Sequence, residues 1–344
     1  MMTTLTSRRR GIQIGDQGQL VLWMLGLMVV VFIVLSITNS TFLSLENLRN
    51  VVNQNAPLII VAMPVTLLMI TGNFDLSIGG VIAMGGVICA WFCQSPVQGG
   101  AGLPYWVAVI IALAACTGMG WLNGFLIVRL GVASVIATLG TMSIARGIAF
   151  VGASGSFVEL GVPDVFKVLG RTEIGGAISL MVLFMITCVV VFFFIQSQTV
   201  FGQRVFLIGA NLKAALLSGV NVKKQVSNLY VISGFISGFA GIMLASKIGA
   251  GDCRMGMEYE FNAVVAIILG GTNLYGGRGN VVGTVIGVFI IGLVANALNM
   301  FGANTSWQPI IKGLVIVGAI LFQRFAMSQK DNHRLRLEQR RAGK

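Results

Sequence analysis

Apolar runs about as long as a bilayer is thick recur along almost the whole chain. Charged or turn-forming residues separate ten such runs, at roughly 20–38, 55–72, 75–94, 104–129, 132–153, 176–195, 226–247, 260–273, 280–300 and 306–326. A helix needs about 20 apolar residues to cross the hydrocarbon core of a membrane. We therefore predict an all-α fold, a polytopic membrane helix bundle with about ten transmembrane spans. The sidedness would be unchanged if two of these runs were half-spans.

The composition agrees with lipid as the main solvent. Hydrophobic residues make up 56% of the 344 residues and charged residues only 10%, whereas soluble domains carry about 25% charged residues. We therefore expect no large soluble domain. We divide the chain into an N-terminal tail (1–19), a transmembrane domain (20–326) with a polar loop (198–225), and a basic C-terminal tail (327–344).

The formal net charge of +12 is unevenly distributed. Three clusters carry much of the positive charge: Arg8, Arg9 and Arg10; Arg204, Lys213, Lys223 and Lys224; and Arg324, Lys330, Arg334, Arg336, Arg340, Arg341 and Lys344. Basic residues concentrate on the cytoplasmic side of polytopic membrane proteins, so both termini and the 198–225 loop are predicted to be cytoplasmic. This pattern argues against a nucleic-acid partner, and it allows the C-terminal tail to attract anionic membrane lipid.

Two glycine-rich segments share the pattern G-x-x-[D/N]-L-x-x-G. The matching residues are Gly72, Asp75, Leu76 and Gly79 in the first segment, and Gly270, Asn273, Leu274 and Gly277 in the second. Each segment follows one apolar run and precedes another, and glycine lets the backbone leave helical geometry. We predict a tight turn at each, on the cytoplasmic side of the membrane.

Asp75 is the only charged residue between Arg49 and Arg129. Asp or Asn just before an apolar run can cap a helix N-terminus, where the helix dipole also favours negative charge. We therefore predict that Asp75 caps the third span through backbone N–H groups. The alternative is functional: these turns, with Asp75, Gly72, Gly79, Asn273 and Gly277, contact a partner or line a pathway.

The 198–225 loop contains the signals of one short helix. Asn211 precedes LKAALLS and Gly219 follows it; Asn is a strong N-cap, Ala and Leu favour helix, and Gly commonly follows a helix end. We predict a helix of about two turns over 212–218. Such a short helix does not persist alone in water, so it must pack on the protein's own surface or on a partner.

Four stretches together resemble one transporter family. They are the 198–225 loop, GNFDLSIGG (72–80), ATLGTMSIARG (137–147) and LGGTNLYGGRGNVVGTVIG (269–287). In these stretches, and over about residues 40–325, the chain resembles the permease subunits of bacterial sugar ABC importers of the ribose, galactose, xylose and autoinducer-2 type. That family is distantly related to branched-chain amino acid permeases.

The resemblance implies a permease subunit of an ATP-driven importer for a monosaccharide or related polyol, in the bacterial plasma (inner) membrane. The implied partners are a cytoplasmic ATP-binding subunit, a second permease chain that is identical or paralogous, and a periplasmic or extracellular sugar-binding protein. The 198–225 loop would be the coupling loop, with docking residues Gly209, Asn211, Ala214, Ala215, Ser218 and Gly219. ATP and Mg²⁺ would bind the partner ATPase, and this chain would hold no cofactor.

The source of energy can also be considered from the residues alone. GGRGN (276–280) lacks the Lys and Ser/Thr of a phosphate-binding loop, so energy must come from a separate subunit or an ion gradient. Ion-coupled carriers usually hold ionisable groups at mid-membrane. Arg129 and Arg146 are expected near span ends or in small-residue turns, and Lys312 can snorkel outward. A separate ATPase is favoured, and an ion-coupled carrier or channel acting alone remains the alternative.

No catalytic or metal-binding group stands out, so we predict neither an enzyme nor a metal site. Glu258 and Glu260 are spaced i, i+2, and on a helix they would not share a face. Four amides are candidates for a solute pathway: Asn55, Asn123, Asn296 and Asn299. Asn suits sugar hydroxyls but also links helices, at about 0.6 kcal/mol per bond in membranes. We expect the structural role for most of them.

Overall fold

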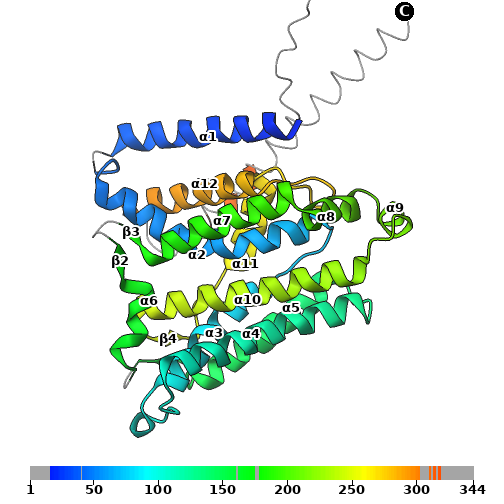
Figure 1. Ribbon diagram of the computed structural model, residues 1–344. Coiled ribbons are helices and arrows are strands. Elements are labelled where there is room, and N and C mark those ends of the chain that lie inside the picture. Colours follow the sequence, from blue (N-terminus) through cyan, green and yellow to red (C-terminus); the bar gives the residue numbers. More distant parts are fainter. Residues whose placement is uncertain are drawn as a thin grey trace, which may run out of the picture.

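The computed structural model describes residues 16–302 except 40, 160, 161 and 175–177, together with residues 310, 313, 314, 317 and 318. The helices are α1 (Asp16–Thr38), α2 (Leu45–Ile70), α3 (Ile78–Cys93), η1 (Pro96–Gln98), α4 (Tyr105–Val128), α5 (Ser134–Gly152), η2 (Asp164–Lys167), α6 (Val168–Arg171), α7 (Leu180–Gln198), α8 (Val200–Ala210), α9 (Leu212–Leu217), α10 (Val222–Ile248), α11 (Tyr259–Leu269) and α12 (Val281–Met300). The long helices lie roughly side by side along one axis (Figure 1).

Short strands lie at one end of this axis, and α9 lies at the other (Figure 1). β1 (Phe157–Val158) pairs antiparallel with β4 (Gly251–Asp252), and β2 (Glu173–Ile174) pairs antiparallel with β3 (Ile178–Ser179). We call these two ends of the molecule the strand end and the α9 end.

Seven helices within the described residues are long and apolar enough to cross a membrane: α1, α2, α4, α5, α7, α10 and α12. They correspond to seven of the ten predicted runs, which confirms a mostly helical, multi-span membrane fold. The third and eighth runs form shorter helices, α3 with 16 residues and α11 with 11. The run at 306–326 and the tail at 327–344 lie largely or wholly outside the described residues.

α2 and α10 start earlier than the predicted apolar runs because each helix begins with a polar turn. α2 begins at Leu45, ten residues before the predicted run, where the Ser44 side chain accepts a hydrogen bond from the Asn47 N–H. α10 begins at Val222, where the Asn221 side chain accepts from the Lys224 N–H. Both helices therefore extend beyond their apolar segments.

α2 and α10 are mostly buried, whereas few side chains of α1 and α7 are buried. α10 packs closely on α4 through Gly120 and Gly234. A Cβ on Gly234 would lie 2.5 Å from the Cys116 carbonyl oxygen, and a Cβ on Gly120 would overlap the Tyr230 carbonyl oxygen. Small residues allow such close backbone approach between membrane helices.

Arg146 is a correction to the sequence analysis. The side chain was expected near a span end or in a turn, but Arg146 lies inside α5, six residues before its last residue, Gly152. Its Nη1 donates to the carbonyl oxygens of Cys253, at 3.1 Å, and Met255, at 2.7 Å. These carbonyls lie outside helices and lack helical partners, which explains why a charged donor is retained within the span.

Candidate functional site

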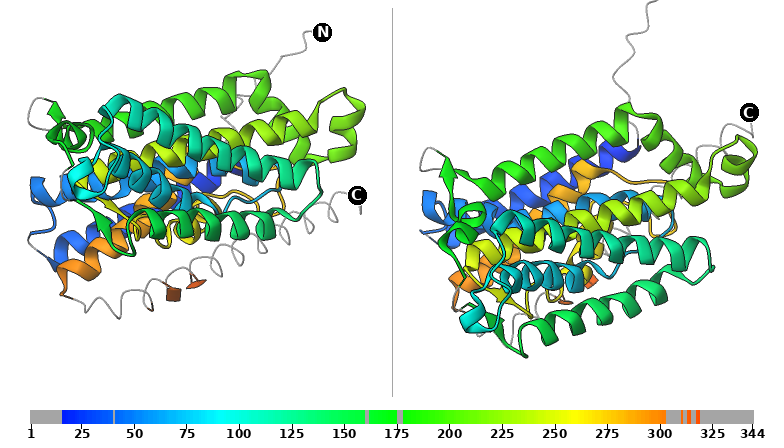
Figure 2. Two further views of the ribbon diagram at one scale, coloured as in Figure 1. Left: turned by 90° about the horizontal axis from the view of Figure 1, so that it is seen from below. Right: turned by 60° about the horizontal axis from the view of Figure 1, so that its bottom comes forward.

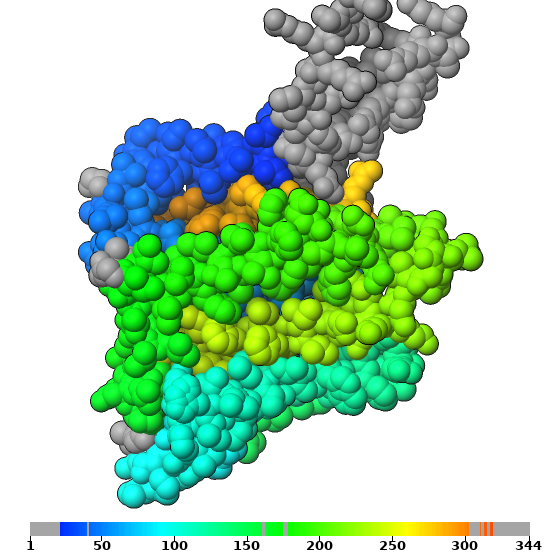
Figure 3. Space-filling view, viewed as in Figure 1, coloured from blue at the N-terminus to red at the C-terminus, as the bar shows by residue number. Residues whose placement is uncertain are grey.

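The α9 end carries a projecting segment made of α8 and α9. It connects α7 to α10 and protrudes beyond the neighbouring helix ends in all three ribbon views (Figures 1 and 2). In the space-filling view the same segment forms a lobe at the edge of the molecule (Figure 3). This is the polar loop 198–225 of the sequence analysis.

The predicted short helix is confirmed to within one residue. The Asn211 side chain accepts from the Ala214 N–H at 3.0 Å, and α9 ends at Leu217 with Ser218 as its C-cap. Gly219 follows with φ of +76°, a conformation that favours glycine. Both ends of α9 are therefore set by the residues that predicted them.

α8 was not predicted. Its N-cap is Thr199, whose side chain accepts from the Gly202 N–H at 3.1 Å. The buried positions Gly202, Val205 and Ile208 recur every third residue, which is the spacing of one helix face. That spacing was the available signal, and the polar character of the loop as a whole obscured it.

α9 leaves most of its apolar surface uncovered. Leu212, Leu216 and Leu217 are exposed, Leu217 to 91%, whereas Ala215 is fully buried. Of the predicted docking residues, Asn211, Ser218 and Gly219 are exposed and Ala214 is partly buried. Ala215 therefore faces inward and cannot contact a partner directly. The three leucines are the docking candidates that the sequence analysis missed.

Gly209 connects the projecting segment to the bundle. A Cβ on Gly209 would overlap the Ile70 carbonyl oxygen at the end of α2, and it would lie 2.5 Å from the Gly277 nitrogen. The Gly277 N–H in turn donates to that Ile70 oxygen at 2.8 Å. We call the contact of Gly209, Ile70 and Gly277 the joint. Gly209 thus belongs to the joint and not to the exposed surface.

The two glycine-rich segments of the internal repeat meet at the joint. A Cβ on Gly276 would lie 2.8 Å from both the Gly72 nitrogen and the Ile70 oxygen. The side chain of Gln196 at the end of α7 holds the second segment, donating to the Gly279 carbonyl at 3.1 Å and accepting from the Val281 N–H at 2.8 Å. The end of α2, the end of α7 and the segment before α12 therefore all lie at or beside the contact with α8.

Asp75 is buried, with 1% of its surface exposed. Its Oδ1 accepts from the N–H of Ser77, at 3.0 Å, and from the Ser77 hydroxyl, at 2.6 Å. Its Oδ2 accepts from the Ser233 hydroxyl of α10 at 2.6 Å. The carboxylate thus joins the start of α3 to α10.

The prediction that Asp75 caps the third span is wrong. The N-cap residue of α3 is Ser77, and its side chain makes no capping bond. The backbone is not helical at Asp75 and Leu76, so the carboxylate reaches a single backbone N–H and otherwise binds hydroxyls. Periodicity alone could not place Ser233, which is 158 residues away in the chain.

The hydrogen-bond network continues beyond Asp75. The Asn123 amide donates to the Ser77 hydroxyl at 2.9 Å, and its oxygen accepts from the Thr141 hydroxyl at 2.6 Å. The Tyr230 hydroxyl donates to the Phe74 carbonyl at 2.8 Å. The network therefore links α3, α4, α5 and α10. Asn123 is fully buried and its amide links these helices; whether it also lines a solute pathway stays a prediction.

The other candidate amides lie nearer the strand end. Asn55 donates to the Val51 carbonyl at 2.7 Å and lies against Gly292 of α12. Asn296 and Asn47 exchange hydrogen bonds at 2.8 and 3.3 Å. Asn299 is exposed in the last turn of α12, and its part in a solute pathway stays a prediction.

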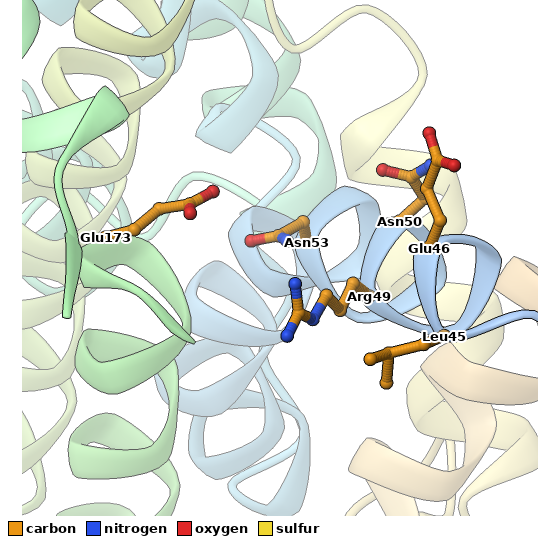
Figure 4. A pocket seen from close by; sticks show the side chains of 6 residues that line it. All are labelled: Leu45, Glu46, Arg49, Asn50, Asn53 and Glu173. Atoms are coloured by element: carbon orange, nitrogen blue, oxygen red, sulfur yellow. The ribbon is translucent and has the colours of Figure 1, made fainter. Parts of the chain in front are cut away.

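A polar pocket of about 410 Å³ lies at the strand end, lined by Leu45, Glu46, Arg49, Asn50, Asn53 and Glu173. In Figure 4, Glu173 extends from the β2 side towards Asn53 of α2. Asn53 also accepts a hydrogen bond from the Ser179 hydroxyl. The pocket therefore lies where the start of α2 meets the β2–β3 hairpin.

Comparison with known proteins identifies the family. A family model described as the permease component of the branched-chain amino acid transport system matches residues 47–320. The ribose import permease protein of Bacillus subtilis is 36% identical over 301 residues, covering 87% of this chain and 91% of that protein. The galactose/methyl galactoside import permease protein of Escherichia coli is 34% identical over 321 residues, covering 89% and 95%.

The L-arabinose ABC transporter permease protein of Azospirillum brasilense is 32% identical over 305 residues, covering 88% of this chain and 87% of that protein. No solved structure matches the chain. The family suggested by the four sequence stretches is therefore confirmed over nearly the whole chain. This multi-pass membrane protein belongs to the permease-component family of the branched-chain amino acid transport system.

Proposed function

We propose that the chain is the membrane-spanning permease subunit of an ATP-driven ABC importer for a monosaccharide or related polyol. The relatives are named as permeases for ribose, galactose and arabinose. The observation that carries the proposal is the exposed leucine face of α9, joined through Gly209 to the helix ends at the two repeat segments.

The proposed partners follow from this arrangement. A cytoplasmic ATPase holding ATP and Mg²⁺ would cover the leucine face of α9. A second permease chain, identical or paralogous, would complete the pathway, and an external sugar-binding protein would deliver solute at the strand end, where the polar pocket opens. Charged pocket residues such as Glu46, Arg49 and Glu173 suit a polar partner surface.

The proposed topology has ten membrane segments with both termini in the cytoplasm of a bacterial plasma (inner) membrane. Seven are the full-length helices. α3 and α11 each complete a crossing together with the non-helical segment before it, and the run at 306–326 is the tenth segment. Six crossings then precede α9 and ten separate the two tails, so the basic tails and α9 lie on one side, as the charge distribution requires.

The proposed mechanism transmits force through the joint. Closure of the ATPases on ATP would move α9 and α8, and a rigid α8 would carry that motion to Ile70 and Gly277. Because packed helices have discrete arrangements and do not deform continuously, a small movement at the joint would switch the pathway between its two openings.

The test compares Leu217→Glu with Val97→Glu. These side chains have nearly equal exposure, 91% and 90%, but Val97 lies in η1, away from α9. Leu217→Glu should reduce both co-purification of the ATPase and ATP-dependent ribose uptake by at least tenfold, because a charge in a desolvated contact costs several kcal/mol. Val97→Glu should leave co-purification unchanged.

The alternative of an ion-coupled carrier or channel is tested with the same material. The permease reconstituted alone should not accumulate sugar under a sodium or proton gradient. Accumulation under those conditions, or normal ATPase binding by Leu217→Glu, would contradict the proposal.

A further inference from the structure

The segment between α10 and α11 does not stay at the strand end. After β4 the chain turns back along α3. A Cβ on Gly251 would lie 2.8 Å from the Val87 Cα, and a Cβ on Gly256 would lie 2.8 Å from the Gly79 oxygen. Residues 253–258 form consecutive turns that lead away from the strand end, and α11 starts where these turns finish.

Two neighbouring helices give the depth of Gly256. Gly80 packs on Met142 of α5, which precedes Gly152 by ten residues, or about 15 Å at 1.5 Å per residue. Gly241 of α10 packs on Ile82 of α3. Gly241 lies about 10 Å from the end of α10 at the strand end, and Gly79 precedes Ile82 by roughly one helical turn, so it lies farther from the strand end. Both estimates place Gly256 about 15 Å from the strand end, half the thickness of the hydrocarbon core.

At this depth the surface is not suited to lipid. Glu258 is exposed and has a φ of +66°, and its neighbour Met257 is 60% exposed. A carboxylate is too short to reach the headgroups from mid-membrane, and charged residues at that depth almost always face a bundle interior or water. By contrast, the exposed residues of α7 from Leu183 to Phe194 are apolar apart from Thr187. They are Leu183, Ile186, Val190, Val191, Phe193 and Phe194.

The interior behind this surface is also polar. Arg146 holds the descending segment through the Cys253 and Met255 carbonyls. Glu260, in the first turn of α11, is 5% exposed and lies against Gly79. Its Oε2 has no hydrogen-bond partner within the described residues. Transporters commonly bind solute where a discontinuous helix begins at mid-membrane.

We propose that Met257, Glu258 and Phe261, the midplane surface, form a wall of the water-filled translocation pathway. The pathway would carry an uncharged polyhydroxylated solute, and Glu258 would accept hydrogen bonds from its hydroxyls. The second permease chain would form the opposite wall. This inference rests on the proposed transport function and names the part of the chain that solute passes.

The decisive experiment compares Met257→Cys with Val190→Cys in the full transporter with its ATPase. Both side chains are 60% exposed. Val190 follows the start of α7, Leu180, by ten residues, so it lies at about the same depth of 15 Å. A membrane-impermeant, positively charged methanethiosulfonate reagent is applied from both sides, and the wild-type chain with its five native cysteines supplies the background.

Met257→Cys should react at least tenfold faster than Val190→Cys, and its modification should block ribose uptake. Equal, slow reaction of both would overturn the inference. If ATP-dependent uptake is intact in that case, the proposed function stands and only the location of the pathway is wrong. Uptake that does not depend on ATP would instead contradict the proposed function, whatever the labelling shows.

A second variant keeps the inference testable if Met257→Cys assembles poorly. Glu258→Met removes the charge and keeps an unbranched chain. If Glu258 lines the pathway, Glu258→Met should have the same unfolding midpoint as the wild-type chain. Its ribose uptake should fall at least fivefold. A raised midpoint with normal uptake would show that Glu258 faces lipid and would overturn the inference.

Discussion

The two repeat segments share one sequence pattern and lie in contact, yet their surroundings differ. In the first, Asp75 and Leu76 are buried, and the carboxylate binds side chains of α3 and α10. In the second, Asn273 and Leu274 are exposed, and the Asn273 side-chain oxygen accepts from the nearby Tyr275 N–H, at 3.0 Å. The shared pattern therefore specifies an interruption between two helices. Whether the Asp or Asn in that interruption binds distant side chains depends on whether it is buried.

Their last glycines differ in the same way. Gly79 is helical and lies under the Glu260 carboxylate. Its counterpart Gly277 has a φ of +78° and contacts Gly209 of the joint. The first break is thus part of the rigid interior, whereas the second lies beside the projecting segment. Four predictions test this difference, from the largest expected effect to the smallest.

Asp75→Ala should have the largest effect on stability. Three donors lose a buried acceptor, and each unsatisfied group costs roughly 1–3 kcal/mol, so the free energy of unfolding should fall by about 3 kcal/mol or more. Titration with a denaturing detergent measures this. Asp75→Asn keeps one acceptor oxygen and should recover about half of the loss. A stability of Asp75→Ala equal to wild type would mean that the network does not hold α3.

Gly79→Ala should come next, at about 2–3 kcal/mol, because the added methyl overlaps Glu260 and overpacking of this kind strains the core. The same titration applies. Gly140→Ala is the control, since a Cβ there meets nothing within 4 Å. Equal stability of the two variants would show that α11 moves away from α3 at little cost.

Gly277→Ala should cost about 1–2 kcal/mol from its left-handed backbone, but its main effect should be on coupling. The added methyl would press on Ala210, 3.2 Å away. We expect fewer solute molecules to be transported per ATP hydrolysed, measured in proteoliposomes that contain the proposed partner ATPase. A stability loss with an unchanged transport ratio would mean that the joint does not transmit motion.

Asn273→Ala should change the free energy of unfolding by less than about 0.5 kcal/mol, because exposed side chains away from special features contribute little. The comparison with Asp75→Ala uses the same titration. Similar losses in the two variants would remove the distinction between the breaks.

Much of the organisation could be predicted because its signals are local. Asn211 and Gly219 bracket α9 through bonds to residues three or fewer positions away, and the apolar runs mark the seven long helices. The bond between Asp75 and Ser233 could not be predicted, because Ser233 reaches Asp75 only through the packing of α10 on α3. The inward orientation of Ala215 and the depth of Gly256 depend on packing in the same way.

The sequence by itself determined a lipid-embedded helical bundle, the positions of the two helix breaks, and a short capped helix in a polar loop. These follow from hydropathy, glycine and capping residues, which act within a few residues along the chain. Only the tertiary structure decided that one break is buried and the other exposed, that both meet at Gly209, and that the segment before α11 folds back along α3. Those outcomes depend on contacts between distant segments, which local preferences do not encode.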